Sequence, residues 1–249
     1  MESACRMRLA AVWIAALGAP FVGGPGEAQV AAHGLTVTPV IINLAPQQMT
    51  TVLTLENHTD READFQVRPF VWDQPGGDER LTPTDALVAS PPLGKIAVGA
   101  KQVVRIVLRQ PPQGREASYR LLLDQVPPPP QPGQIGLALR LSLPLFAEPG
   151  VRVSAHLRWS VEPNGAVYDL VAVNDGGRHE TVRDLALSAA DGRRLDLESN
   201  VSPYILAGAT RRWRILTRNF APSREALRLT AHASAGVIDQ AVSAPSVAP

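Results

Sequence analysis

The chain has 249 residues, 45% of them hydrophobic, which is long enough for two packed domains of about 110 residues each. Its formal net charge of +1 argues against broad electrostatic binding to nucleic acid or to an anionic membrane surface. The single cysteine, Cys5, lies close to the start, so we expect the rest of the chain to fold without a disulfide.

The first 32 residues have the features of a secretory signal. Arg6 and Arg8 form a basic region, residues 9–22 are apolar and rich in alanine, and small residues follow. We expect cleavage after Ala28 or Ala32 and assign residues 1–28 as the signal peptide. The apolar run is too short to span a membrane comfortably, so the mature protein is expected to be soluble and exported.

Short alternating or apolar runs follow the signal, and helical periodicity is nearly absent. The stretch 74–94, with its Pro-Gly-Gly and Pro-Pro motifs, is predicted to be rich in loops. The number and spacing of the runs in residues 33–149 indicate an immunoglobulin-like β-sandwich. Its predicted strands are Leu35–Leu44, Thr51–Glu56, Phe65–Trp72, Gln102–Leu108, Ser118–Val126 and Ile135–Phe146.

A second, smaller β-sandwich is predicted in residues 150–249, after a hinge at Glu148-Pro149-Gly150. Turn sequences such as Pro163-Asn164-Gly165 separate its runs, and the tail from Ser243 is expected to fray. The predicted strands are Arg152–Val161, Val167–Asn174, Thr181–Ser188, Arg194–Leu197, Arg211–Leu216, Leu227–Ala233 and Ala235–Val242.

The run QIGLALRLSLPLFAEP carries the most informative pattern in the chain. Its apolar residues alternate strictly with small or polar ones, over about twice the usual strand length. A long apolar edge strand recruits other chains through its unpaired backbone groups, so this strand is suited to being lent to a partner. In the alternative interpretation, the same side chains face the protein's own core. They are Ile135, Leu137, Leu139, Leu141, Leu143 and Leu145.

The sequence has no convincing enzyme site. The five histidines are scattered without zinc-site spacing, and there is no nucleophile elbow, phosphate loop or cysteine nucleophile. Asp73, Asp78 and Glu79 share a loop but lack the ligand spacing of a calcium site. We therefore expect no catalytic activity, no metal or other cofactor, and no small-molecule substrate.

Five motifs in order resemble the periplasmic pilus chaperones of chaperone–usher systems. They are LTVTPVIINL, TLEN, SPPLGKIAVGAKQVVRIVL, REASYRLLLDQVPPPP and LRLSLPLFAEP, and together they span residues 35–149. The resemblance implies two immunoglobulin-like domains in a boomerang arrangement, located in the periplasm. It also implies donor-strand complementation, in which the chaperone lends its last N-domain strand to a pilin or coat-protein subunit before an outer-membrane usher receives the subunit.

By that resemblance Ile135, Leu137, Leu139 and Leu141 form the subunit-binding donor strand. The well-known branch of the family anchors the subunit's terminal carboxylate with two cations, and their positions here fall at Ile41 and Pro144. Neither residue can donate a charge-assisted bond. The SLPLF ending and the YRLLL strand are more similar to the divergent archaic or spore-coat-type branch.

The anchor candidates in this chain are Arg120 and Arg140, because a guanidinium fork suits a carboxylate. Each could instead lie on a solvated strand face. Glu116 matches a position that often helps to fix the domain angle in the family, but its usual basic partner is Glu148 here, so that ion pair is not expected.

Two other functions compete with an assembly chaperone. The chain could be a secreted adhesive or structural subunit built from immunoglobulin-like modules, although a subunit would usually be one domain lacking a strand. A secreted hydrolase is a weaker alternative, because the nucleophile and base are missing.

Overall fold

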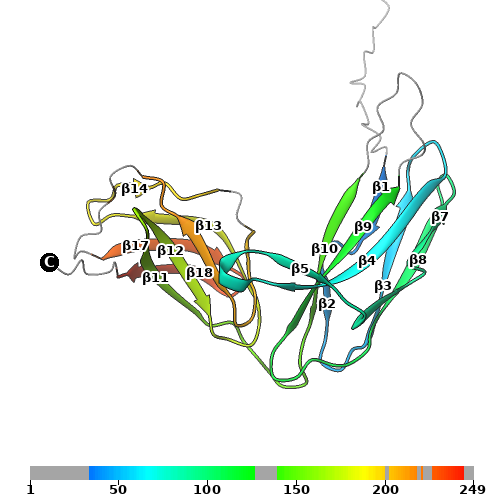
Figure 1. The fold of residues 1–249 in the computed structure, drawn as a ribbon, viewed down its shortest axis with the longest axis horizontal. Coiled ribbons are helices and arrows are strands. Elements are labelled where there is room, and N and C mark those ends of the chain that lie inside the picture. Colours follow the sequence, from blue (N-terminus) through cyan, green and yellow to red (C-terminus); the bar gives the residue numbers. More distant parts are fainter. Residues whose placement is uncertain (1–33, 127–138, 200–201, 218–219, 221–225, 244–249) are drawn as a thin grey trace, which may run out of the picture. The chain divides into compact units, whose positions relative to one another are not determined.

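The computed structural model describes residues 34–126, 139–199, 202–217, 220 and 226–243, which form β-strands and one short 3₁₀ turn (Figure 1). The strands build four sheets that surround two separate hydrophobic cores. The all-β fold class with two immunoglobulin-like sandwiches is therefore confirmed. Residues 1–28, predicted to be a signal peptide, and the residues Ile135 and Leu137 lie outside the described residues.

The first sandwich pairs a sheet of order β1-β3-β8-β6 with one of order β2-β10-β9-β4-β5, to which β7 adds through β4. Its strands are β1 (Leu35–Thr38), β2 (Ile42–Leu44), β3 (Thr50–Asn57), β4 (Ala63–Asp73), β5 (Arg80–Pro83), β6 (Leu87–Ser90), β7 (Leu93–Ile96), β8 (Lys101–Leu108), β9 (Ala117–Val126) and β10 (Arg140–Ala147). The 3₁₀ turn η1 (Pro75–Gly77) connects β4 to β5.

The second sandwich pairs a sheet of order β11-β12-β16 with one of order β14-β13-β17-β18, and β15 pairs with β13. Its strands are β11 (Leu157–Asn164), β12 (Val167–Asn174), β13 (Glu180–Ser188), β14 (Arg194–Leu195), β15 (Tyr204–Ile205), β16 (Thr210–Arg214), β17 (Leu227–Ala233) and β18 (Gly236–Val242).

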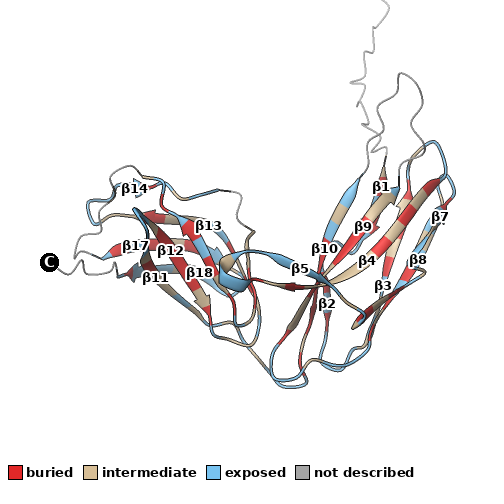
Figure 2. Ribbon diagram, in the orientation of Figure 1, coloured by how far each residue is buried: buried red, intermediate tan, exposed pale blue. Residues whose placement is uncertain are grey.

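Alternating side chains build both cores, as red bands along the strands show (Figure 2). In β8, for example, Val104, Ile106 and Leu108 are buried, while Lys101 and Arg105 face solvent. Sequence periodicity therefore found this strand and β17, and an apolar run found β12; the predicted bounds of β12 and β17 are those that the structure has.

Two predictions were wrong in the first sandwich. Residues 35–44 form two strands in different sheets, with exposed Val40 and Ile41 between them, because the chain crosses from one sheet to the other. The stretch predicted as loop-rich contains β5, β6 and β7. These strands have four residues each, which is too short for alternation to stand out against the neighbouring prolines.

A buried asparagine organises the same corner of each sandwich. The Asn57 side-chain amide donates to the carbonyl oxygens of Arg61 (2.8 Å) and Ile96 (2.8 Å). The Asn174 amide donates likewise to those of Arg178 (2.7 Å) and Ile205 (3.1 Å). In the second sandwich this corner carries Arg178 and His179 towards the first.

Candidate functional site

The last strand of the first sandwich, β10, has an open edge. It pairs with β9 over its whole length, from Arg140 to Ala147. On its other side it pairs with β2 at residues 145–147 only. No other described strand borders residues 140–144 on that side, so half of β10 can accept another strand.

The hydrogen-bond pattern shows which backbone groups face this edge. The N–H of Gln125, in β9, donates to the carbonyl of Leu139 (2.9 Å), so Gln125 and Leu139 form a hydrogen-bonded pair of the antiparallel ladder. Antiparallel pairing alternates, so the N–H and C=O groups of Arg140 and Ser142 point away from β9, toward the open edge. Pro144 has no N–H to offer, which limits pairing at the far end.

The alternating leucines divide between two environments. Leu143 and Leu145 are 4% and 0% exposed in the protein's own core, and Leu141 is partly buried against that core. Leu139 is 39% exposed, and its neighbours Leu137 and Ile135 lie outside the described residues. The own-core interpretation therefore holds for the second half of the pattern.

Arg120 lies beside the open edge, on the outer face of the sheet. It is the cross-strand neighbour of Pro144, one of the two positions where the well-known branch has an anchoring cation and this chain has none. Its guanidinium carbon is 3.7 Å from the centre of the Trp72 ring, and its Nη1 donates to the carbonyl of Ser142 (3.4 Å). The guanidinium therefore reaches the carbonyl that faces the open edge.

Burial lowers the pKa of Arg120, an effect that the Glu79 carboxylate partly opposes. Among the described residues, no carboxylate lies within 4 Å of this guanidinium. A half-buried cation without a direct counter-ion is suited to receiving an anion.

Arg140 has a different environment. Its Nε is ion-paired with Asp124, which also accepts from Arg68 Nη2 at 2.7 Å. Hydrogen bonds from both arginines hold the pKa of Asp124 below its usual value, although burial acts to raise it. Arg140 is thus ion-paired within the sheet, whereas Arg120 has no carboxylate partner among the described residues.

The two sandwiches are also joined by an ion-pair network that the sequence analysis did not expect. Glu116, with a side chain only 1% exposed, has Oε1 within 2.7 Å of His179 Nδ1, and the His179 backbone N–H donates to the same oxygen (3.2 Å). Arg178 Nη2 lies 3.1 Å from Glu148. As expected, Glu116 does not pair with Glu148; instead, basic residues of the second sandwich pair with both carboxylates.

Aromatic side chains surround this network. The Phe146 ring stacks on the His179 ring with centroids 3.6 Å apart, and Trp72 and Tyr204 meet edge to face at 5.4 Å. Trp72 and Phe146 form a small apolar cluster with residues of the second sandwich. Arg120 thus lies at the border between this apolar cluster and the open edge of β10.

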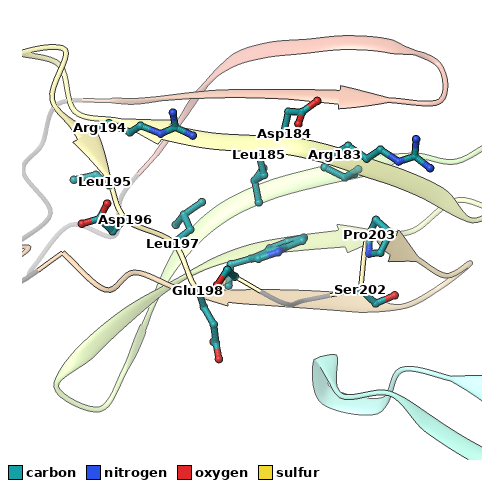
Figure 3. Close-up of a pocket in the computed structure, with 13 residues that line it drawn as sticks. Arg183, Asp184, Leu185, Arg194, Leu195, Asp196, Leu197, Glu198, Ser202 and Pro203 are labelled. Carbon is teal, nitrogen blue, oxygen red and sulfur yellow. The ribbon is translucent and has the colours of Figure 1, made fainter. Parts of the chain in front are cut away.

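A pocket of about 650 Å³ lies in the second sandwich (Figure 3). Arg183 and Arg194 lie at opposite ends of it, so its polar groups do not converge on one point. Two of its lining residues, Ser199 and Ser202, flank residues that the structure does not describe.

Within the described ranges, no three His, Cys, Asp or Glu side chains are grouped to hold a metal ion. The same part of the chain contains no helix long and apolar enough to cross a membrane.

Comparison with known proteins agrees with the motif resemblance. Residues 34–151 match the family model described as "Pili and flagellar-assembly chaperone, PapD N-terminal domain". A search of curated protein sequences finds no significant match.

Solved structures share the fold over most of the chain. The CsuC–CsuE chaperone–tip adhesion subunit complex from archaic Csu pili of Acinetobacter baumannii is 22% identical over 84% of this chain and 97% of the other, with a TM-score of 0.63. The SafA pilin–SafB chaperone complex of Salmonella enterica is 14% identical over 84% and 96%, with a TM-score of 0.59. The Pseudomonas aeruginosa CupB2 chaperone is 15% identical over 83% and 100%, with a TM-score of 0.55.

The resemblance recognised from the five motifs is therefore confirmed: residues 34–151 match the model of the PapD N-terminal domain of pili and flagellar-assembly chaperones.

Proposed function

We propose that the chain is a periplasmic chaperone that stabilises pilus or coat-protein subunits by donor-strand complementation and delivers them to an outer-membrane usher. The observation that carries the proposal is the open edge of β10 at residues 140–144, with Arg120 beside it, which has no carboxylate within 4 Å among the described residues. The fold shared with chaperones that were solved together with their subunits supports the same role.

A subunit that lacks one strand exposes a hydrophobic groove and unpaired backbone groups. β10 can supply the ladder through the outward N–H and C=O groups of Arg140 and Ser142. Ile135, Leu137 and Leu139 are the proposed groove-filling side chains, since every second residue of an inserted strand points into the groove. Leu141, which is partly buried against the protein's own core, lies between the leucines proposed to enter the cargo and those that belong to the core.

We assign the carboxylate anchor to Arg120 rather than to Arg140. Arg140 already shares Asp124 with Arg68, and using it would break that network. Arg120, on the adjacent strand β9, would take the place of the cation missing at Pro144, its cross-strand neighbour. It contacts the edge carbonyl of Ser142, two residues before Pro144. A fixed terminus would set the register of the inserted strand, because a slip of one residue would turn the wrong side chains into the groove.

The domain organisation and address are part of the proposal. Residues 1–28 act as a signal peptide, residues 33–149 form the chaperone domain and residues 150–249 form the smaller domain. The periplasmic protein should begin at Gln29 or His33 and contain no thiol, since Cys5 would be removed. Mass analysis of the exported form measures both, and a mature chain that retains Cys5 would contradict the assignment.

The experiment that tests the function is co-purification from periplasm, followed by identification of the bound proteins. We expect small β-rich subunits, bound to the wild type and absent from a Leu139→Asp variant of equal yield and thermal stability. Loss of pilus or coat assembly in cells without the chaperone gene would support delivery to the usher.

The alternative is a secreted immunoglobulin-like adhesive or structural subunit. Such a protein would itself appear in the assembled fibre or coat, whereas a chaperone would remain in the periplasm. Recovery of this chain from purified surface fibres would therefore favour the alternative.

A further inference from the structure

Two nearly perpendicular aromatic rings lie next to the Arg120 guanidinium. Its central carbon is 3.7 Å from the centre of the Trp72 ring and 5.6 Å from the centre of the Tyr204 ring. The two rings meet edge to face, with centroids 5.4 Å apart and planes inclined by 81°. Trp72 belongs to β4 of the first sandwich and Tyr204 to β15 of the second, so each sandwich contributes one ring. We call these two residues the aromatic corner.

The aromatic corner is held in place by contacts with both sandwiches. The Gln74 side chain donates to the Tyr204 carbonyl (2.9 Å) and accepts from the Leu206 N–H (3.0 Å), so it fixes the backbone of β15. The Phe146 ring, on β10, has its centroid 5.6 Å from that of Tyr204. Trp72 is only 2% exposed and packs in the same apolar cluster as Phe146 and Leu206. The rings are therefore part of a packed cluster with little freedom to move.

Stacking leaves the hydrogen-bonding edge of the guanidinium available. A cation–π contact uses the flat face of this group, whereas its N–H donors lie in its plane and point outward. One donor, on Nη1, reaches the Ser142 carbonyl at the open edge of β10 (3.4 Å). Among the described residues, no carboxylate lies within 4 Å of the Arg120 guanidinium. The aromatic corner thus restrains the plane of the guanidinium without using its donors.

A side chain that is already restrained binds an anion more tightly than a mobile one. A mobile arginine loses rotamer freedom when it binds, and this loss weakens an affinity by roughly two- to tenfold. Because the aromatic corner restrains Arg120 before any ligand arrives, the loss has already occurred in the folded chain.

We propose that Tyr204 is a positioning residue of the carboxylate anchor: together with Trp72, it holds the Arg120 guanidinium in the plane that presents its free donors to a cargo carboxylate. The inference rests on the proposed function, in which Arg120 binds that carboxylate. The ring of Tyr204 does the positioning, and its hydroxyl is not needed. The second sandwich is thereby part of an anchor whose cation lies in the first.

The first test measures the mobility of the Arg120 side chain in the mature chain without ligand. NMR relaxation of the Nε–H signals of Arg120 and Arg105 reports it, and loss of each signal in an Arg→Lys variant assigns it. In wild type, Arg120 should be as rigid as the backbone, whereas Arg105, which faces solvent on β8, should be mobile. Tyr204→Leu should make Arg120 more mobile, and Tyr204→Phe, which keeps the ring, should not. An Arg120 as mobile as Arg105 in wild type would overturn the inference.

The second test measures the affinity for a free carboxylate. N-acetylvaline mimics a peptide carboxyl terminus, N-acetylvalinamide is its uncharged control, and the Arg120 Nε–H signal reports the titration of each. Tyr204→Phe should bind the acid as wild type does, and Tyr204→Leu should bind it roughly two- to tenfold more weakly. Tyr168→Leu is the matched control and should keep the wild-type affinity. Tyr168 is also half-buried in the second sandwich, where it meets Phe220 edge to face at 5.6 Å.

The outcomes separate this inference from the anchor on which it rests. Equal affinity of Tyr204→Leu and Tyr168→Leu for the acid, whether unchanged or reduced in both, would overturn the role of Tyr204 and leave the anchor intact. If the acid did not shift the Arg120 signal of wild type more than the amide does, both would be overturned. Subunit capture measured by co-purification is independent of this titration, so strand lending can stand or fall separately.

Discussion

Replacing Arg120 by alanine should weaken subunit binding by about one to two orders of magnitude. A charge-assisted hydrogen bond to a carboxylate in a partly desolvated site contributes about 1.5–3 kcal/mol, which is roughly 10- to 150-fold in affinity. The site fits that description, because the guanidinium is half-buried between Trp72 and the Ser142 carbonyl and has no carboxylate within 4 Å among the described residues.

The assay is a calorimetric titration with a peptide of the co-purified subunit's last strand, made as the free acid and as the amide. Wild type should prefer the acid, and Arg120→Ala should bind both forms equally. Arg120→Lys should recover only part of the preference, because an ammonium lacks the planar fork and stacks poorly on Trp72. The alanine variant also loses the stacking contact, worth about 0.5–2 kcal/mol, so its folding must be checked by thermal unfolding.

Arg140→Ala is the control, since Asp124 keeps its bond to Arg68. If Arg120→Ala retained the full preference for the acid, the anchor assignment would be refuted. If Arg140→Ala lost the preference instead, the anchor would lie on β10 itself.

Three further predictions follow from the contacts. Leu139→Asp should abolish subunit capture with little change in thermal unfolding, because the new charge would be buried in the cargo groove without a partner. Leu143→Ala, in the protein's own core, should instead lower the free energy of unfolding by about 2–5 kcal/mol in urea. If Leu139→Asp failed to fold, this leucine would belong to the core. Glu116→Ala should cost about 3–5 kcal/mol, because it leaves His179 without its buried partner, while Arg178 keeps Glu148. Asp239→Ala at an exposed pair should change nothing measurable; equal effects of the two would contradict the network. The depressed pKa of Asp124 means that its ionised form stabilises the fold above the ordinary value of 3.8, and that this contribution is lost as the pH falls through the lower folded pKa. Asp124→Asn should therefore flatten the acid side of the stability profile, and an unchanged profile would show that the Arg68 and Arg140 bonds do not form in solution.

The sequence was sufficient to predict the strands with clear alternation and the resemblance to pilus chaperones. β8 and β17 have one face in a core, so their period of two was readable, whereas β9 and β12 have consecutive buried residues and were readable as apolar runs. It was insufficient where an element is too short to show a period. β15 has two residues, and its backbone is held by pairing with β13 and by Gln74, which lies far away in the sequence.

The site was only partly readable for a similar reason. Alternation identified the leucine series, but it could not show that Leu143 and Leu145 belong to the protein's own core. The partners of Glu116 and Glu148 lie in the second sandwich, where no local pattern points to them. One signal was available and missed: Asn57 and Asn174 both stand four residues before an arginine, and both are followed later by a Gly-Ala pair whose glycine has a positive φ, Gly99 at 69° and Gly208 at 73°. That shared motif would have placed Arg178 at the corresponding corner.

The central claim is that the open edge of β10 receives a strand of the cargo. Amide hydrogen exchange measured by NMR tests it most directly, with and without bound subunit. In the free chain, the N–H groups of Arg140 and Ser142 should exchange fast, while those of Leu141 and Leu143, which face β9, should already be protected. Binding should slow exchange at Arg140 and Ser142 and leave Leu143 nearly unchanged. Fast exchange at Arg140 and Ser142 in the fully bound complex would show that the subunit binds elsewhere.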